Sequence, residues 1–329
     1  MVKEGERPDR ALFFSTDSVP ARDRLAYLRE ALGRSTARLD LGPVEGRLLG
    51  WSASLYLLDG LRVISGKTNG VTCHRTPPLL TDGNDDFVFT TNLSGTSLIF
   101  QVGRECRLQP GEAALLSSSD VGGHDFHGPA RYLTLRIQRR RLNSMAMSPE
   151  DALARLVPAN TEALRLLIDY VQSAVQRHQL ASPQLRQLFT KHVYDLVALA
   201  VGATRETSDM ANGRGLPAAR LSAIKDDIAN GLGSEHLDIA SIATRRGITP
   251  RYVQTLFEAE GITFTEYVLG QRLTLAHRIL TDPSRRGWTI SKIAFEAGFG
   301  NLSYFNRVFR RAFDATPSDL RAKALAARK

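Results

Sequence analysis

Two short stretches near the C-terminal end of the sequence carry side chains suited to hydrogen-bonding the edges of DNA bases. In residues 297–313, AGFGNLSYFNRVFRRAF, the side chains Phe305, Phe309 and Phe313 recur every four residues, which is helical spacing. The opposite face of that helix carries Ser303, Asn306 and Arg307. Arg can bind guanine through two hydrogen bonds, and Asn or Gln can bind adenine in the same way. A basic amphipathic helix also suits a solvated face or a membrane surface, so the rest of the chain must decide.

The same frame of residue types occurs a second time, about 50 residues earlier. Residues 239–257 repeat the pattern of residues 290–309: Ile and Ala in a first helix, then Gly, a capping Thr or Asn, and a Phe-bearing second helix. Ala and Gly allow the close helix approach and the tight turn that a helix-turn-helix needs. The repeat therefore predicts two such units, at about 239–260 and 290–313.

The two predicted units supply a set of expected DNA contacts. Base-edge contacts are expected from the outer face of each second helix, at Arg251, Gln254, Thr255, Ser303, Asn306 and Arg307. Phosphate contacts, which carry no sequence information, are expected from Arg272, Lys292, Arg310 and Arg311. Between the units, residues 263–282 keep helical period, and a helix of about 16 residues spans roughly 24 Å. Such a connection can place two recognition helices in successive major grooves, about 34 Å apart.

Composition favours a polyanionic partner and a reducing compartment. The 329 residues carry a net charge of +9, and residues 218–329 hold 17 Lys and Arg against 11 Asp and Glu, a net +6. The sequence has two cysteines, too few for a disulfide framework or a thiolate zinc site. It shows no signal peptide and no apolar run of about 20 residues, so we expect a cytoplasmic protein without a membrane span.

The elements before residue 218 predict an α+β, two-domain chain. A helix is expected over residues 20–38, and short runs of β-branched and aromatic residues separated by turns predict an antiparallel sandwich or barrel over about 44–137. Residues 150–202 again have helical period. The expected domains are a sheet-rich domain at 1–145, a helical segment at 146–203, a linker at 204–217 and an all-α DNA-binding domain at 218–329.

Residues 221–322 resemble the DNA-binding domain of the AraC/XylS transcriptional regulators. The resemblance rests on GFGNLSYFNRVFRRAFDATPSDLR in the second unit and LFEAEGITFTEYVLGQRLTLAHRIL in the first unit and connecting helix. Asp314 stands where the family usually has Gly, and Leu320 where it usually has Tyr. FSTDSVPARDRLAYLREAL and GTSLIFQVGRECRLQPGEAALLSSSD are similar to the family's cupin-like ligand-binding domain. The resemblance implies that residues 1–145 form a cupin-like sensor domain and that residues 146–203 form a helical dimerisation segment. It also implies a ligand-responsive regulator, an activator by expectation, that forms a homodimer, binds promoter DNA and recruits RNA polymerase.

A sensor domain of this type should contain an apolar pocket with a few polar groups. The candidates for effector contact are Trp51, His74, Arg75, Phe89, His124 and His127, with Tyr56, Phe87, Phe100 and Phe126 as further aromatic candidates. Arg75 suits an anionic ligand, since guanidinium groups match carboxylates. The alternative is that most of these aromatics are core or surface residues.

The segment GGHDFHGP, residues 122–129, tests the hypothesis of a cupin-type metal site. His124 and His127 are three residues apart, which on a strand places them on opposite faces. The His-x-His pair and downstream Glu of metal-binding cupins are missing, so we expect no metal, no cofactor and no enzyme. A metal-dependent cupin enzyme with a helical tail and a basic interaction module remain the rival hypotheses. The basic run RIQRRRLNSM, residues 136–145, is interpreted as a solvated strand end, the alternative being that Arg139, Arg140 and Arg141 contact DNA or an acidic partner.

Overall fold

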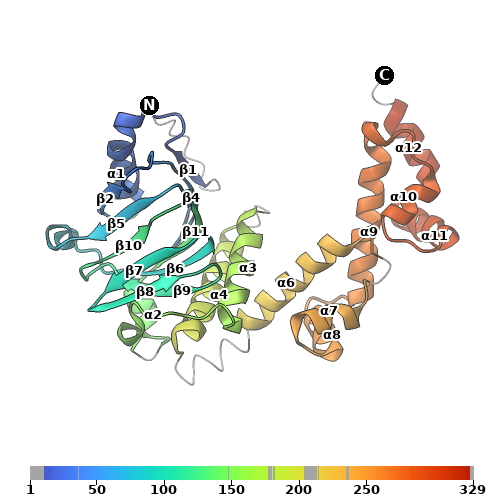
Figure 1. Ribbon diagram of the computed structural model, residues 1–329. Coiled ribbons are helices and arrows are strands. Elements are labelled where there is room, and N and C mark those ends of the chain that lie inside the picture. The colour runs from blue at the N-terminus through green and yellow to red at the C-terminus, as the bar shows by residue number, and fades with distance from the viewer. Residues whose placement is uncertain are drawn as a thin grey trace. The chain divides into compact units, whose positions relative to one another are not determined.

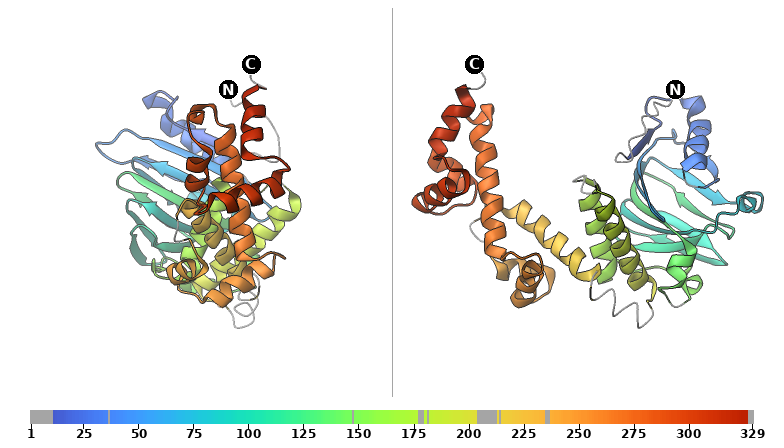
Figure 2. Two further views of the ribbon diagram at one scale, coloured as in Figure 1. Left: turned by 90° about the vertical axis from the view of Figure 1, so that its right-hand side faces the viewer. Right: turned by 180° about the vertical axis from the view of Figure 1, so that it is seen from behind.

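The computed structural model describes residues 11–326, except 36, 147, 177–179, 181, 204–212, 214 and 235–236 (Figures 1 and 2). The chain divides into two compact units, residues 1–219 and 220–329. Most of the linker expected at 204–217 lies outside the described residues, and its last three residues belong to a helix, α6 (Gly215–Gly231).

The first unit contains two antiparallel sheets that face each other (Figure 1). One sheet has the order β1-β3-β4-β11-β6-β9 and the other the order β2-β5-β10-β7-β8. The strands are β1 (Leu12–Ser15), β2 (Asp40–Pro43), β3 (Trp51–Leu58), β4 (Leu61–Thr68), β5 (Val71–Arg75), β6 (Phe87–Ser94), β7 (Ser97–Gln101), β8 (Arg104–Leu108), β9 (Ala113–Ser117), β10 (Gly122–Phe126) and β11 (Ala130–Ile137). This is the antiparallel sandwich expected from the regular spacing of short apolar runs and turns, and it is cupin-like, as the family resemblance implied.

Helices flank the sheets of this unit. The helix expected over 20–38 begins with a 3-10 turn, η1 (Ala21–Asp23), and continues as α1 (Arg24–Ser35). After the sandwich come η3 (Pro149–Ala152), α3 (Glu162–Gln176) and α4 (Pro183–Val201), and α3 and α4 lie side by side in both figures. Ser182 caps α4 by accepting a hydrogen bond from the Leu185 amide at 3.1 Å.

The interpretation of residues 136–145 as a solvated strand end is wrong. Arg136 lies inside strand β11 and is only 5% exposed, and the chain then turns into a short helix, α2 (Arg139–Asn143). Arg139 stacks over the Phe87 ring at 4.2 Å and pairs with Glu150 at 2.7 Å. This run of arginines therefore contributes to the packing at one end of the sandwich.

The second unit is all-helical and contains two small cores joined by one helix. Its elements after α6 are α7 (Ile239–Arg246), α8 (Pro250–Glu258), α9 (Phe264–Thr281), η4 (Pro283–Arg285), α10 (Ile290–Glu296), α11 (Leu302–Phe313) and α12 (Pro317–Ala326). The first half of α9 packs Phe264 and Val268 into the α7–α8 core, and its second half packs Leu273 and Ile279 into the α10–α11 core. The helix expected over 263–282 therefore supports both helix-turn-helix units.

In both helix-turn-helix units, the chain turns between the two helices through a left-handed glycine. Gly247 and Gly298 adopt left-handed φ values of 66° and 85°, and the next amide bonds back to the first helix, from Ile248 to Ala243 at 3.0 Å and from Phe299 to Ala294 at 2.9 Å. The second helices then start at side-chain caps, Thr249 and Asn301, which accept from the Tyr252 and Tyr304 amides. The repeat seen in the sequence is thus a repeat of backbone conformation.

The stripe of Phe residues on α11 forms the core of the second helix-turn-helix. Phe305 and Phe309 are fully buried, with ring centroids 5.3 Å apart, and Phe313 stacks on Phe309 at 4.6 Å. Tyr304 does not share this core, because 41% of its surface is exposed at the start of the helix. Tyr304 therefore lies at the edge of the apolar face of α11.

Candidate DNA-reading faces and ligand pocket

The outer face of α8 presents the side chains proposed to contact bases in the first helix-turn-helix. Arg251, Gln254 and Thr255 are all exposed, while Val253 and Phe257 on the other side are fully buried. The Thr255 hydroxyl donates to the Arg251 carbonyl within the helix at 3.1 Å. Arg251 and Gln254 therefore have long side chains free to extend outward, whereas the short Thr255 has its hydroxyl already engaged.

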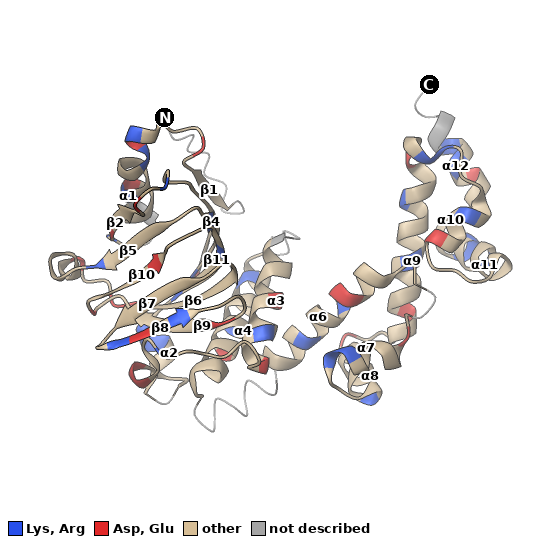
Figure 3. Cartoon of the chain, in the orientation of Figure 1, with Lys and Arg blue, Asp and Glu red and all other residues tan. Residues whose placement is uncertain are grey.

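The outer face of α11 has the same arrangement in the second helix-turn-helix. Ser303, Asn306 and Arg307 are exposed, and the Arg307 guanidinium lies 5.6 Å from the centre of the Tyr304 ring. Arg310 and Arg311 follow in the last turn and are also exposed. Figure 3 shows the Lys and Arg positions of α11 in blue. Because this face carries three cations beside hydrogen-bonding side chains, it can supply both base and phosphate contacts.

Two further residues proposed as phosphate contacts differ in their surroundings. Lys292 on α10 is exposed, with its ammonium 4.3 Å from the centre of the Trp288 ring. Arg272 on α9 donates to the carbonyls of Leu232 and Ser234, both at 3.2 Å. These hydrogen bonds join α9 to the segment after α6, so Arg272 has a structural role and fewer donors available for DNA.

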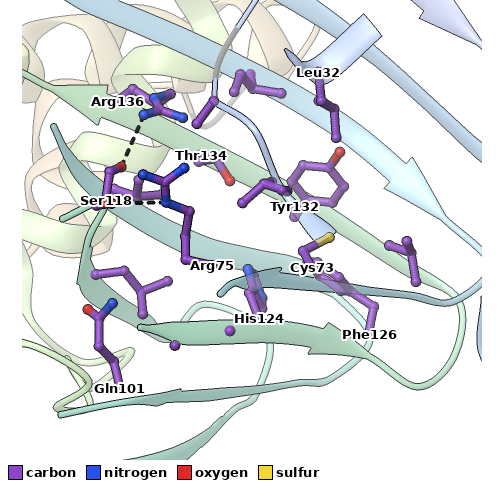
Figure 4. Close-up of a pocket in the computed structure, with 18 of the residues that line it drawn as sticks. Leu32, Cys73, Arg75, Gln101, Ser118, His124, Phe126, Tyr132, Thr134 and Arg136 are labelled. Atoms are coloured by element: carbon purple, nitrogen blue, oxygen red, sulfur yellow. Dashed lines mark hydrogen bonds between the residues drawn. The ribbon is translucent and has the colours of Figure 1, made fainter. Parts of the chain in front are cut away.

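The first unit contains a cavity of about 130 Å³ between its two sheets (Figure 4). Alternate residues of three strands point into it, because successive side chains of a strand face opposite sides. These are Val71, Cys73 and Arg75 of β5, His124 and Phe126 of β10, and Tyr132, Thr134 and Arg136 of β11. Trp51 of β3 donates its indole N–H to the Tyr132 hydroxyl at 2.6 Å. Apolar side chains line most of the cavity, with polar groups gathered on one side, as in an effector site.

Arg75 lies at the polar side of this cavity but has most of its donors occupied. Its two terminal nitrogens bind both oxygens of Asp82 at 2.9 Å, and its Nε donates to the Ser118 carbonyl. Hydrogen bonding by Arg75 lowers the pKa of Asp82 to about 2. The pair is therefore a buried ion pair in which the charge of Arg75 is balanced within the protein.

Arg136 is a pocket residue that reasoning from the sequence missed. Both of its hydrogen bonds leave from Nη2, to Asn84 Oδ1 at 2.8 Å and Ser118 Oγ at 3.0 Å (Figure 4 shows the second). Its Nε is buried with no hydrogen-bond partner in the described part of the chain, and the Asp86 carboxylate lies 3.7 Å away. Burial lowers the pKa of this guanidinium to about 10, so it is cationic at neutral pH.

The other candidates proposed from the sequence fall into two groups. Trp51, Arg75, His124 and Phe126 line the cavity, and His74, Phe89, His127, Tyr56, Phe87 and Phe100 do not. His74 follows Cys73 on β5 and so faces outward, where it bonds Asp125 at 2.8 Å and packs against Phe100. Phe89 is buried in the core, and His127 is exposed beyond the end of β10.

His124 is held in its neutral form inside the pocket. Its Nε2 lies 2.8 Å from Ser97 Oγ, and burial lowers its pKa to about 3. Within the described residues, no group of three or more His, Cys, Asp or Glu side chains is arranged to hold a metal ion. In the same residues, no helix is long and apolar enough to span a membrane.

Comparison with known proteins identifies the family. Residues 242–323 match the family model of a helix-turn-helix domain, and residues 28–201, more than half of the chain, match that of the AraC-binding-like domain. The chain belongs to the AraC family of transcriptional regulators. It is 36% identical over 164 residues to the transcriptional activator RhrA of Rhizobium meliloti (strain 1021), a match covering 50% of each chain. It is 27% identical over 273 residues to the transcriptional activator NphR of a Rhodococcus species, covering 78% of this chain and 76% of NphR.

A solved structure aligns along most of the chain. The AraC-like transcriptional activator CuxR aligns over 87% of this chain and 99% of its own, with 17% identity and a TM-score of 0.48. The chain spans about half the length of RhrA in this match. The activity, effector and partners of this chain are therefore proposed separately below.

One departure of this AraC-family chain from the usual pattern has a visible structural consequence. Asp314, where the family usually has Gly, ends α11 with a φ of 50° in the left-handed region. Asp is among the few non-glycine residues that adopt this conformation readily. The substitution lies after the exposed face of α11 and leaves Ser303, Asn306 and Arg307 exposed.

Proposed function

We propose that the protein is a cytoplasmic, ligand-responsive transcriptional activator that binds two successive major grooves of promoter DNA. The observation that carries the proposal is the pair of helix-turn-helix units, each with a left-handed glycine in its turn, a side-chain cap, and exposed polar side chains on its second helix. Both units pack on α9, whose 18 residues span about 27 Å. That length suits two recognition helices separated by one turn of DNA, about 34 Å.

The first experiment is selection of bound fragments from randomised DNA by the purified protein near physiological salt. Two enriched base blocks about one helical turn apart are expected. Salt-sensitive binding to any duplex, with no enrichment in the presence or absence of candidate effectors, would contradict sequence-specific DNA recognition.

Replacing Arg307 by Ala is expected to weaken specific binding by about 1–3 kcal/mol and to relax one base position. The physical reason is loss of a bidentate contact to a base edge from an exposed guanidinium. Thr255→Ala should cost less, because the Thr255 hydroxyl is engaged within its own helix. The measurement is the dissociation constant for the selected site and for each single-base variant.

Arg278 provides the matched control for this prediction. It is an exposed arginine of the same unit that lies on α9 rather than on a recognition helix. Arg278→Ala should leave the base preference unchanged. If Arg307→Ala weakened binding to all sequences equally, Arg307 would be a phosphate contact, and the sequence preference would have to come from other residues of α8 and α11.

We also propose a homodimer formed through residues 146–203, with RNA polymerase as the partner of the DNA-bound protein. The support for the dimer is a pair of exposed leucines on α4, Leu185 and Leu188, which are 48% and 49% exposed. They lie three residues apart and so share one face of the helix. Exposed apolar pairs of this kind are typical of association surfaces.

A further inference from the structure

The polar side of the pocket holds an unusual group, a buried guanidinium with unused donors. The Arg136 side chain is only 5% exposed, yet Nη2 is the one nitrogen of its guanidinium that hydrogen-bonds within the described part of the chain. Buried polar groups in folded proteins almost always have a partner, so an unpaired N–H beside a cavity indicates a missing acceptor. Ser118 strengthens the indication, since its Oγ accepts from Arg136 and its own proton remains available to a further acceptor.

The charges around Arg136 favour an anionic acceptor over a neutral one. The charged groups that act on it are Arg62, Arg75, Asp82 and Asp86. Asp82 is committed to Arg75 by two hydrogen bonds, and Asp86 approaches Arg136 Nε only to 3.7 Å. Neither carboxylate therefore makes a close hydrogen bond to Arg136, and an anion in the cavity would find its guanidinium incompletely neutralised.

The remainder of the cavity limits the body of such a ligand. Away from Arg136, the walls include Cys73, Phe126 and Tyr132 (Figure 4), and the apolar side chains of Ile64 and Val71 also line the cavity. The volume of about 130 Å³ is comparable to a cavity of about 150 Å³ that holds one benzene ring. The space therefore suits one ring or a short aliphatic chain and excludes a sugar, whose hydroxyl groups would meet apolar side chains without hydrogen-bond partners.

We propose that the effector of this protein is a small carboxylic acid with a compact apolar body, whose carboxylate binds the free N–H groups of Arg136 and the hydroxyl of Ser118. The proposal rests on the ligand-responsive function proposed above and names the chemical class of the effector. It shifts the anion-binding role from Arg75, whose charge is balanced by Asp82, to Arg136. Arg75 instead positions Ser118 by donating to its carbonyl at 2.9 Å.

The test compares acids with their uncharged amides on the full-length protein. Benzoate, phenylacetate and hexanoate are titrated against benzamide, phenylacetamide and hexanamide, with calorimetry and thermal unfolding as the measurements. At least one acid should bind, and its amide should bind at least about tenfold more weakly, because it loses a charge-assisted hydrogen bond in a buried site. Equal binding of acid and amide would overturn the proposal without any variant being needed.

Two variants then locate the carboxylate. In Arg136→Gln the ratio of acid to amide affinity should fall to about one, whereas a general loosening of the fold would weaken both ligands together. Arg131 lies on the same strand and is exposed, so Arg131→Gln should keep the full ratio. Ser118→Ala should lower the affinity for the acid and leave that for the amide less affected, which tests the site if Arg136→Gln does not fold.

The proposed function and this inference can fail separately. Selection of bound DNA is run on the same protein preparation. If base blocks are enriched and none of the acids binds, the assignment of the ligand class is overturned while the regulator remains. If amides bind and alter DNA binding as strongly as acids do, the protein is ligand-responsive but the carboxylate assignment is wrong.

Discussion

At the scale of single residues, hydrogen-bond partners decide which side chains can bind a ligand. Arg75 and Arg136 are both buried arginines that line the same pocket. Arg75 has a carboxylate partner at 2.9 Å through two bonds, whereas the carboxylate of Asp86 is 3.7 Å from Arg136. In a low-dielectric site, a guanidinium whose carboxylate partner lies farther away and accepts no hydrogen bond attracts an anion more strongly than one bound through two hydrogen bonds.

The neutral state of His124 predicts a pH dependence of stability. Its pKa is about 3 in the folded protein against about 6.5 in the unfolded chain. Between these values the unfolded chain binds a proton that the folded protein does not, so stability falls as pH decreases below about 6.5. The loss approaches about 1.4 kcal/mol per pH unit. His124→Gln should remove this contribution, measured by urea unfolding at several pH values between 7 and 5.

His127 is the control for this measurement because it is exposed just beyond the same strand. His127→Gln should keep the pH dependence of the unmodified protein. The sequence has two Trp residues, Trp51 in the first unit and Trp288 in the second. Both variants also carry Trp288→Phe, so that the fluorescence signal comes from Trp51 and reports unfolding of the first unit. An unchanged slope in His124→Gln would mean that His124 titrates normally in the folded state.

At the scale of elements, the turns of the two helix-turn-helix units depend on glycine to different degrees. Gly247 and Gly298 both have positive φ, but only at Gly298 would a Cβ overlap neighbouring atoms, the Leu232 carbonyl oxygen and the Arg272 guanidinium. At Gly300 the φ is not positive, and a Cβ would meet no atom within 4 Å. The three positions therefore separate backbone strain from steric overlap.

Replacing each of these glycines by Ala should lower the free energy of unfolding of residues 220–329 by a different amount. Gly300→Ala should be close to neutral, and Gly247→Ala should cost about 1–2 kcal/mol from the left-handed conformation alone. Gly298→Ala should cost more, because the added carbon also displaces the Leu232 carbonyl that Arg272 binds. The measurement is the free energy of unfolding by urea. Equal costs at Gly247 and Gly298 would show that the Leu232 contact yields without strain.

Separation along the chain explains which features the sequence could predict. Helices, caps and glycine turns depend on residues within a few positions of each other, so the two helix-turn-helix units and the exposed side chains of α8 and α11 followed from spacing alone. The pocket depends on pairing between distant strands. Arg136 is buried because β11 pairs with β6 and β4, where it lies opposite Val88 and Arg62. A basic run considered without those partners resembles a solvated segment, which is why Arg136 was missed.

At the scale of the whole molecule, sensing and DNA binding are assigned to separate units. The pocket is lined only by residues 32–136, and both helix-turn-helix cores are built only from residues 221–320. The excess positive charge is also concentrated in the second part, with a net +6 in residues 218–329 out of +9 in the chain. Because each unit has a core of its own, we expect each to fold without the other.

A fragment of residues 215–329 should therefore behave as an independent DNA-binding unit. It should fold, remain monomeric at concentrations where the full chain is a dimer, and bind a single copy of the selected site without responding to carboxylic acids. The reason is that α9 carries both recognition helices, whereas the proposed dimer surface and the pocket lie in the first unit. Sedimentation velocity and DNA titration measure the two properties. Full-length protein with Leu185→Glu and Leu188→Glu should also be monomeric, while Leu48→Glu, at an exposed leucine outside residues 146–203, should remain dimeric. A dimeric fragment would move the association surface out of residues 146–203 and into the DNA-binding unit.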